Sequence, residues 1–166
     1  QSSYKISNIF KKILGLDSSY FLALRALGRA YLALDDIKNS LLFFNQAIQL
    51  KKDDVNLMNE IVNVYNKIEK YQSSKKILEY ALSLKPLDPK TLNNLAIVFR
   101  KLEDYELAIS NSIKAIELDP KNDRYITNLA VAVAESGDYV KAIALNRKAI
   151  KINSSNHVAH SNLGAG

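Results

Sequence analysis

The amino-acid sequence predicts an all-α fold, a solenoid in which antiparallel helix pairs repeat along the chain. Three observations support this prediction. Apolar positions recur every 34 residues, each interval contains two stretches of helical periodicity, and the 166 residues include only 5 Gly and 3 Pro. So few turn-forming residues fit long helices with short connections better than an all-β protein. A fixed period of this length is characteristic of repeat architectures.

The period is strict in several columns of the sequence. One column holds only Ala, a second holds Leu or Ile, and a third holds Tyr. In this order, the columns are Ala47, Ala81, Ala115 and Ala149, then Leu27, Ile61, Leu95, Leu129 and Leu163, then Tyr71, Tyr105 and Tyr139. Because the columns share one phase, we expect one structural unit per interval.

Each unit is expected to contain two helices. In the unit that starts at residue 89, apolar residues recur at helical spacing over 92–99 and again over 108–116. Polar turns separate the helices, and Pro86 and Pro120 prevent the preceding helix from continuing. In chain order, the sequence predicts a second helix at about 3–16, full units at 21–54, 55–88, 89–122 and 123–156, and a partial unit at 157–166.

Packing between the units must supply most of the stability, because a helix of about 14 residues is only marginally stable alone in water. Large aromatic side chains on both helices of a unit are expected to fill the seams between neighbours. These residues are Phe10, Tyr31, Phe44, Tyr65 and Phe99. Small residues in the column of Gly28 should let the two helices of a unit approach closely, although Val62 replaces a small residue there.

The unit that starts at residue 89 carries a known family pattern. Its small, large and proline positions are Asn94, Leu95, Ala96, Phe99, Tyr105, Ala108, Ala115 and Pro120. With these residues the chain resembles the tetratricopeptide repeat family over essentially its whole length, although Leu24, Met58, Leu92 and Ile126 stand where the family often has Trp. The resemblance implies one domain over 1–166, a right-handed superhelical solenoid of four full repeats with a half repeat at each end, within a longer protein.

In that family, the first helix of each repeat lines a concave groove that binds an extended peptide. The matching positions here are rich in amide and basic side chains. The expected peptide-binding residues are Arg25, Arg29, Asn59, Asn63, Lys67, Lys90, Asn93, Asn94, Lys101, Arg124 and Asn128. The resemblance thus implies a protein-interaction scaffold with its working surface on the first helices.

An Asn side chain can both donate to and accept from the backbone of a bound peptide. Asn94, Asn128 and Asn162 recur at one period and resemble the asparagine ladder of O-linked N-acetylglucosamine transferase repeats, but Glu60 interrupts the column. A second family variant, the two-carboxylate clamp of chaperone-binding repeats, is matched incompletely by Asn59, Asn63, Asn94, Arg124 and Asn128.

Residues suited to catalysis or metal binding are scarce. The chain has no Cys, and His157 and His160 lack a third ligand at suitable spacing. Acidic residues at the turns, such as Asp54 and Asp104, are expected to cap helices. We therefore expect no enzyme activity, no cofactor and no metal site. The uncharged apolar stretches are also far shorter than the roughly 20 residues that cross a bilayer.

The net charge of +6 favours a partner segment that is acidic or ends in a carboxylate. Three alternatives remain open. The chain could be the non-catalytic recruiting arm of a larger enzyme, such as a glycosyltransferase similar to O-linked N-acetylglucosamine transferase. Single-stranded RNA binding suits the basic charge but not the Ala, Tyr and Pro columns. Self-association could occur through ends cut within a repeat, where Leu14, Leu16, Val158 and Leu163 would be exposed.

Overall fold

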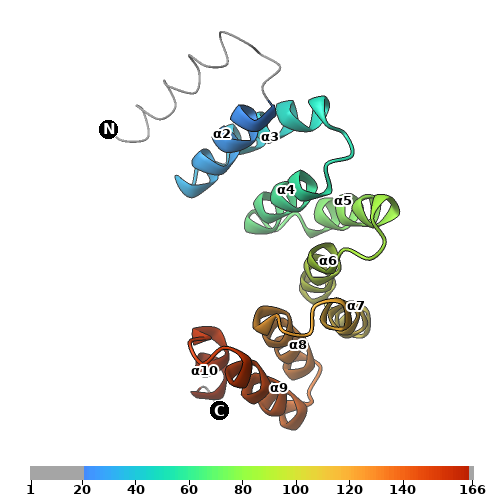
Figure 1. Cartoon of the computed structure of the whole chain (residues 1–166), viewed down its shortest axis with the longest axis vertical. Helices are drawn as coiled ribbons and strands as arrows, with labels where there is room; N and C mark the ends of the chain where they lie inside the picture. The colour runs from blue at the N-terminus through green and yellow to red at the C-terminus, as the bar shows by residue number, and fades with distance from the viewer. Residues whose placement is uncertain (1–20, 165–166) are drawn as a thin grey trace. The chain divides into compact units, whose positions relative to one another are not determined.

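The structure, a computed structural model, describes residues 21–164, and its ordered elements within that range are all α-helices (Figure 1). This confirms the predicted all-α fold class. The expected half repeat at 1–20 and its aromatic residue Phe10 lie outside the described residues, as do the last two residues of the chain. None of the helices described has the length and apolar character of a membrane span.

Two classes of helix alternate along the chain. The first helices have 13 residues each and are α2 (Phe21–Ala33), α4 (Val55–Lys67), α6 (Pro89–Lys101) and α8 (Asp123–Glu135). The second helices have 14 residues each and are α3 (Ile37–Leu50), α5 (Tyr71–Leu84), α7 (Tyr105–Leu118) and α9 (Tyr139–Ile152). The described part of the chain ends with α10 (His157–Gly164), a helix of 8 residues.

Aspartate side chains begin most of these helices. Asp36, Asp54, Asp88, Asp104 and Asp138 each occupy an N-cap, and each carboxylate accepts a hydrogen bond from the backbone N–H three residues further on. The carboxylate satisfies an otherwise unpaired N–H group and meets the positive end of the helix dipole. The acidic residues at the turns therefore have the capping role that the sequence predicted.

The first helices end in a recurring left-handed turn. Asp35, Glu69, Glu103 and Gly137 follow them at a spacing of 34 residues, and all four have a positive φ, between 58° and 101°. In each turn, the next residue donates its N–H to the carbonyl five residues earlier, as Asp104 does to Phe99 at 2.9 Å. This is the hydrogen bond of a Schellman motif, which reverses the chain into the second helix.

The chain divides into two compact units, residues 1–70 and residues 71–166, with the boundary inside the predicted repeat at 55–88. In unit 1, α2 packs along α3, and α3 contacts α4. Gly28 lies so close to the buried ring of Phe44 that a Cβ there would be 2.4 Å from Cδ1. Tyr31 stacks on Phe43 with ring centroids 5.3 Å apart.

In unit 2, each helix from α5 to α10 packs against the next, and α6 also contacts α8. The core lies between first and second helices, where small and branched residues interlock. One buried cluster contains Ile126, Ala149 and Ala159, and a second contains Leu129, Val133 and Ala142. This packing leaves one side of α6 and α8 to polar and charged side chains.

Candidate functional site

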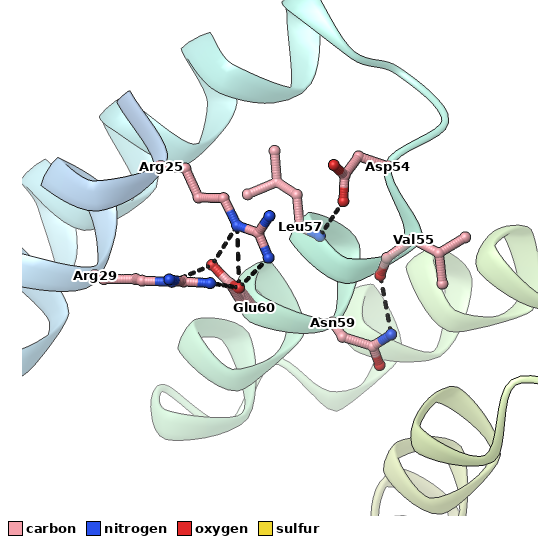
Figure 2. Close-up of polar contacts among 7 residues, drawn as sticks. All are labelled: Arg25, Arg29, Asp54, Val55, Leu57, Asn59 and Glu60. Atoms are coloured by element: carbon pink, nitrogen blue, oxygen red, sulfur yellow. Dashed lines mark hydrogen bonds and ion pairs between the residues drawn. The ribbon is translucent and has the colours of Figure 1, made fainter. Parts of the chain in front are cut away.

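Helices α2 and α4 of unit 1 bring together three charged side chains, which we call the Glu60 cluster (Figure 2). Arg25 and Arg29 lie one turn apart on α2, and Glu60 lies on α4. Arg25 donates from Nε to both carboxylate oxygens, at 3.1 and 3.2 Å, and from Nη2 to Oε1 at 2.5 Å. Arg29 donates from Nε to Oε2 at 2.9 Å and from Nη2 to Oε1. Both guanidinium groups therefore bind the same carboxylate.

The charge state of the cluster follows from its surroundings. Burial alone would raise the pKa of Glu60, because it disfavours the charged form, but the hydrogen bonds and charges of Arg29 and Arg25 outweigh burial and lower the pKa. The hydrogen bond from Arg29 to Glu60 raises the pKa of Arg29 in turn. Glu60 is therefore ionised at neutral pH, and it cancels one of the two arginine charges.

The other expected binding residues of unit 1 have mixed surroundings. Asn59 is fully buried, and its Nδ2 donates to the carbonyl of Val55 at 2.9 Å (Figure 2). Lys67 forms an ion pair with Asp35, with Nζ and Oδ1 2.6 Å apart. Asn63 is exposed on α4. Of the expected residues in unit 1, only Asn63 thus presents a side chain that is both exposed and without a partner among the described residues.

Unit 2 carries a second polar surface, the α6–α8 face, which we define by Lys90, Asn93, Arg124 and Asn128. Asn128 Nδ2 donates to Asn93 Oδ1 at 2.9 Å and so joins α8 to α6. Lys90 lies three residues before Asn93, and Arg124 lies four residues before Asn128. These spacings place each basic residue on the same side of its helix as the amide that follows it.

The basic residues of the α6–α8 face are available to a ligand. Lys90 and Arg124 are exposed, and within residues 21–164 neither forms an ion pair. Arg100, near the end of α6, instead binds Glu135 of α8, with Nη1 and Oε1 2.6 Å apart. Lys101 is exposed beside Arg100.

The predicted asparagine ladder is engaged within the protein. Asn94 is buried, with 9% of its surface exposed. Asn128 donates to Asn93, and Asn162 donates to Asn146 Oδ1 at 3.2 Å. These bonds use one amide donor of Asn128 and one of Asn162, so a peptide would meet the remaining donors and acceptors.

Polar side chains of neighbouring first helices bind each other, which the columns of the sequence did not reveal. Three such contacts, Arg25–Glu60, Asn93–Asn128 and Arg100–Glu135, join residues 35 positions apart. A search for complementary side chains at one period plus one residue would have found them. Glu60 then becomes the partner of Arg25 rather than a gap in the asparagine column.

Groups suited to catalysis or metal binding do not gather in the described part of the chain. His157 and His160 are exposed, and His160 Nε2 lies 3.0 Å from the carbonyl oxygen of Ser154. Over residues 21–164, no three His, Cys, Asp or Glu side chains lie close enough together to hold a metal ion.

Comparison with solved structures identifies proteins of the same fold. A thermophilic TPR protein of Thermus thermophilus, TTC0263, is 15% identical, with a TM-score of 0.83 over 95% of this chain and 87% of that one. YrrB, described as a TPR protein with an unusual peptide-binding site, is 22% identical, with a TM-score of 0.73 over 96% and 84%. MamA is 19% identical, with a TM-score of 0.73 over 87% and 85%. At these identities, the likeness shows the fold, a solenoid of helical repeats.

Comparison with protein families gives the same assignment from the sequence. Two family models match, both described as tetratricopeptide repeat, one over residues 24–54 and one over residues 87–155. A search of curated protein sequences gave no significant match. The two matched segments together span more than half of the chain. They contain all of α6 and α8 and most of α2, the helices that carry the basic residues of both surfaces. The chain therefore belongs to the tetratricopeptide repeat family.

Proposed function

We propose that this chain is a non-catalytic scaffold that binds an extended, acidic segment of a partner protein on the α6–α8 face. One observation carries the proposal. Lys90 and Arg124 occupy equivalent positions on neighbouring first helices, and both are exposed without an ion pair in the described structure. By contrast, Arg25, Arg29 and Arg100 already bind carboxylates of the chain. Among the described residues, Lys90 and Arg124 thus remain free to bind an acidic segment.

The spacing of these two residues specifies the ligand further. Contacting helices lie about 8–10 Å apart. A peptide in the polyproline II conformation advances about 3.1 Å per residue and returns every third side chain to the same side. Two carboxylates three residues apart would therefore reach Lys90 and Arg124 together. One turn further along the helices, Asn93 is buried, and Asn128 offers its remaining amide groups to the peptide backbone. The preferred motif is thus Glu or Asp at two positions separated by two other residues.

Two considerations support a protein ligand over other polyanions. Amide groups recognise a peptide backbone whatever its side chains, and charge complementarity sets its orientation and its association rate. The fold is shared with YrrB, a structure described as having a peptide-binding site. The α6–α8 face carries amide groups one helical turn from its two cations, and this arrangement suits an extended segment better than a single small ion.

The experiment is a titration of the ¹⁵N-labelled protein with a short peptide that contains two Glu residues three positions apart. We expect amide shifts that centre on 90–93 and 124–128. The double variant Lys90→Gln/Arg124→Gln should weaken binding about tenfold or more, since each charged contact contributes about 1 kcal/mol at a partly exposed site.

A matched control removes the same charge elsewhere. Lys114→Gln/Lys148→Gln changes two exposed lysines that are also one repeat apart, but on the second helices α7 and α9. This variant should bind the peptide like the wild type. Equal losses in both double variants would show that the net charge, and not the α6–α8 face, attracts the peptide, and the proposal would be wrong.

A further inference from the structure

The proposed binding at the α6–α8 face does not explain why two arginines converge on Glu60 in unit 1. The two arginines lie on α2, among the positions where the family resemblance predicts contact with a peptide. Glu60 stands in the column that contains Asn94, Asn128 and Asn162 in the later repeats and Ala26 in the preceding one. An acidic residue therefore replaces an amide at the one place in the described part of unit 1 where two guanidinium groups converge.

The carboxylate of Glu60 is almost fully enclosed by its partners. Its side chain is only 11% exposed to solvent, and five hydrogen bonds from the two arginines converge on its oxygens (Figure 2). Each arginine uses Nε and Nη2, the edge of the guanidinium that binds carboxylates in a two-pronged manner. A carboxylate has about four lone-pair sites, so Glu60 is saturated.

The arginine side chains are more exposed to solvent than the glutamate side chain. The Arg25 side chain is 18% exposed, and the Arg29 side chain is 58% exposed. A ligand can thus reach Arg29, but Glu60 occupies the Nε and Nη2 edge of the guanidinium that would bind a carboxylate. An incoming carboxylate would have to displace Glu60, whose effective concentration at the site is very high because it belongs to the same chain.

We propose that Arg25 and Arg29 form a second carboxylate-binding site, which Glu60 fills from within the chain, so that Glu60 excludes acidic segments from unit 1. Glu60 is then a specificity-determining residue. It leaves unit 1 with one net positive charge at the cluster, shared over two paired guanidinium groups. This inference concerns α2 and α4 only, and it does not require that the α6–α8 face binds peptide.

The test measures whether removal of the internal carboxylate opens the site. The starting protein is the variant Lys90→Gln/Arg124→Gln, which removes the basic residues of the α6–α8 face, and the probe is a fluorescein-labelled hexaglutamate peptide. Adding Glu60→Gln, which keeps the shape but not the charge, should raise the affinity for the probe about tenfold. Adding Arg25→Gln/Arg29→Gln to that protein should abolish the gain.

A control separates this effect from the change in net charge. Glu117→Gln removes one negative charge from the exposed end of α7, where Glu117 has no ion pair within the described residues. It should leave the affinity for hexaglutamate unchanged within about twofold, because solvent and salt screen a distant surface charge. A gain equal to that of Glu60→Gln would overturn the proposal.

The remaining outcomes are also decisive. If Glu60→Gln does not fold, Glu60→Asn replaces it, since Asn is the residue at the equivalent position of the three later first helices. A folded variant that gains no affinity, or a gain that survives the loss of both arginines, would overturn the proposal, and so would unfolding of both variants. Failure of the α6–α8 face would instead appear in otherwise unaltered protein, as binding that Lys90→Gln/Arg124→Gln leaves intact.

Discussion

At the scale of single residues, Glu60 shows how a buried charge is kept in a helical repeat. A carboxylate taken out of water is costly unless its oxygens are hydrogen-bonded and its charge is balanced. Arg25 and Arg29 provide both, and the pKa of Glu60 lies below its ordinary value of 4.5 despite its burial. The contact therefore stabilises the folded chain wherever Glu60 is ionised.

The pH dependence of stability follows from the sign of this shift. A carboxyl group whose pKa is lowered by folding contributes stability that is fully present above its unfolded pKa of 4.5 and is lost as the pH falls through the folded pKa. We expect Glu60→Gln to reduce the free energy of unfolding at pH 7 by about 1 kcal/mol. The effect is small for a charged pair because Arg29 is exposed and solvent screens its charge.

The measurement is urea unfolding of both proteins at pH 7 and at pH 3. The difference between them should be constant from pH 7 down to about pH 5 and should shrink below pH 4.5, where Glu60 is protonated first in the unfolded chain and then, at its lower pKa, in the folded one. A difference that is equally large at pH 3 would show that packing of the side chain, and not its ionisation, stabilises the protein.

At the scale of elements, the turn between the two helices of a repeat has a specific backbone requirement. Its central residue has a left-handed conformation in each described repeat, with φ of 61° at Asp35, 58° at Glu69, 63° at Glu103 and 101° at Gly137. A side chain with Cβ adopts this region at a cost of about 1–2 kcal/mol, whereas Gly adopts it freely. The last turn thus contains the residue that suits its backbone, and the others do not.

We therefore expect Glu103→Gly to stabilise unit 2. The relief of strain should exceed the greater flexibility that Gly gives the unfolded chain, for a net gain of about 0.5–1 kcal/mol. Thermal unfolding followed by circular dichroism would measure it. The reverse change, Gly137→Ala, should destabilise by a similar amount, although a Cβ there would meet no atom within 4 Å.

A third substitution controls for glycine itself. Lys114→Gly lies in α7 at an exposed position, where Gly should cost about 1 kcal/mol relative to a good helix former. Stabilisation by Glu103→Gly together with destabilisation by Lys114→Gly would assign the effect to the left-handed turn. Loss of stability in both would contradict the assignment.

How far the sequence predicts these elements depends on the range of the interaction involved. Ala47, Ala81, Ala115 and Ala149 are all fully buried, as their shared column suggested, because burial at a helix crossing depends on the local period. The Glu60 cluster was not predicted, because a column comparison aligns residue 60 with residue 94, not with its partner Arg25 on the preceding first helix. The offset between neighbouring helices sets that pairing, and no single repeat contains it.

At the scale of the whole molecule, the net charge of +6 attracts any polyanion. This value already counts the carboxylates of Glu60, Asp35 and Glu135, which pair locally with Arg25 and Arg29, Lys67 and Arg100. The long-range attraction depends on the total charge, whereas a contact at Lys90 and Arg124 depends on where a ligand places its carboxylates. These two contributions respond differently to the sequence of the ligand.

Peptides of one composition can therefore separate the general field from the α6–α8 face. We expect a peptide with two Glu residues about three positions apart to bind at least about threefold more tightly than an isomer with adjacent Glu residues, because in the polyproline II conformation only the first places both carboxylates on one side at the separation of neighbouring helices. Titrations at about 50 and about 300 mM NaCl should show both affinities falling as the Debye length shortens from about 14 to about 6 Å. Their ratio should persist, since net charge is the same for both isomers and only the separation of the carboxylates differs. A ratio of one at both salt concentrations would assign all of the attraction to the overall charge and leave Lys90 and Arg124 without a specific role.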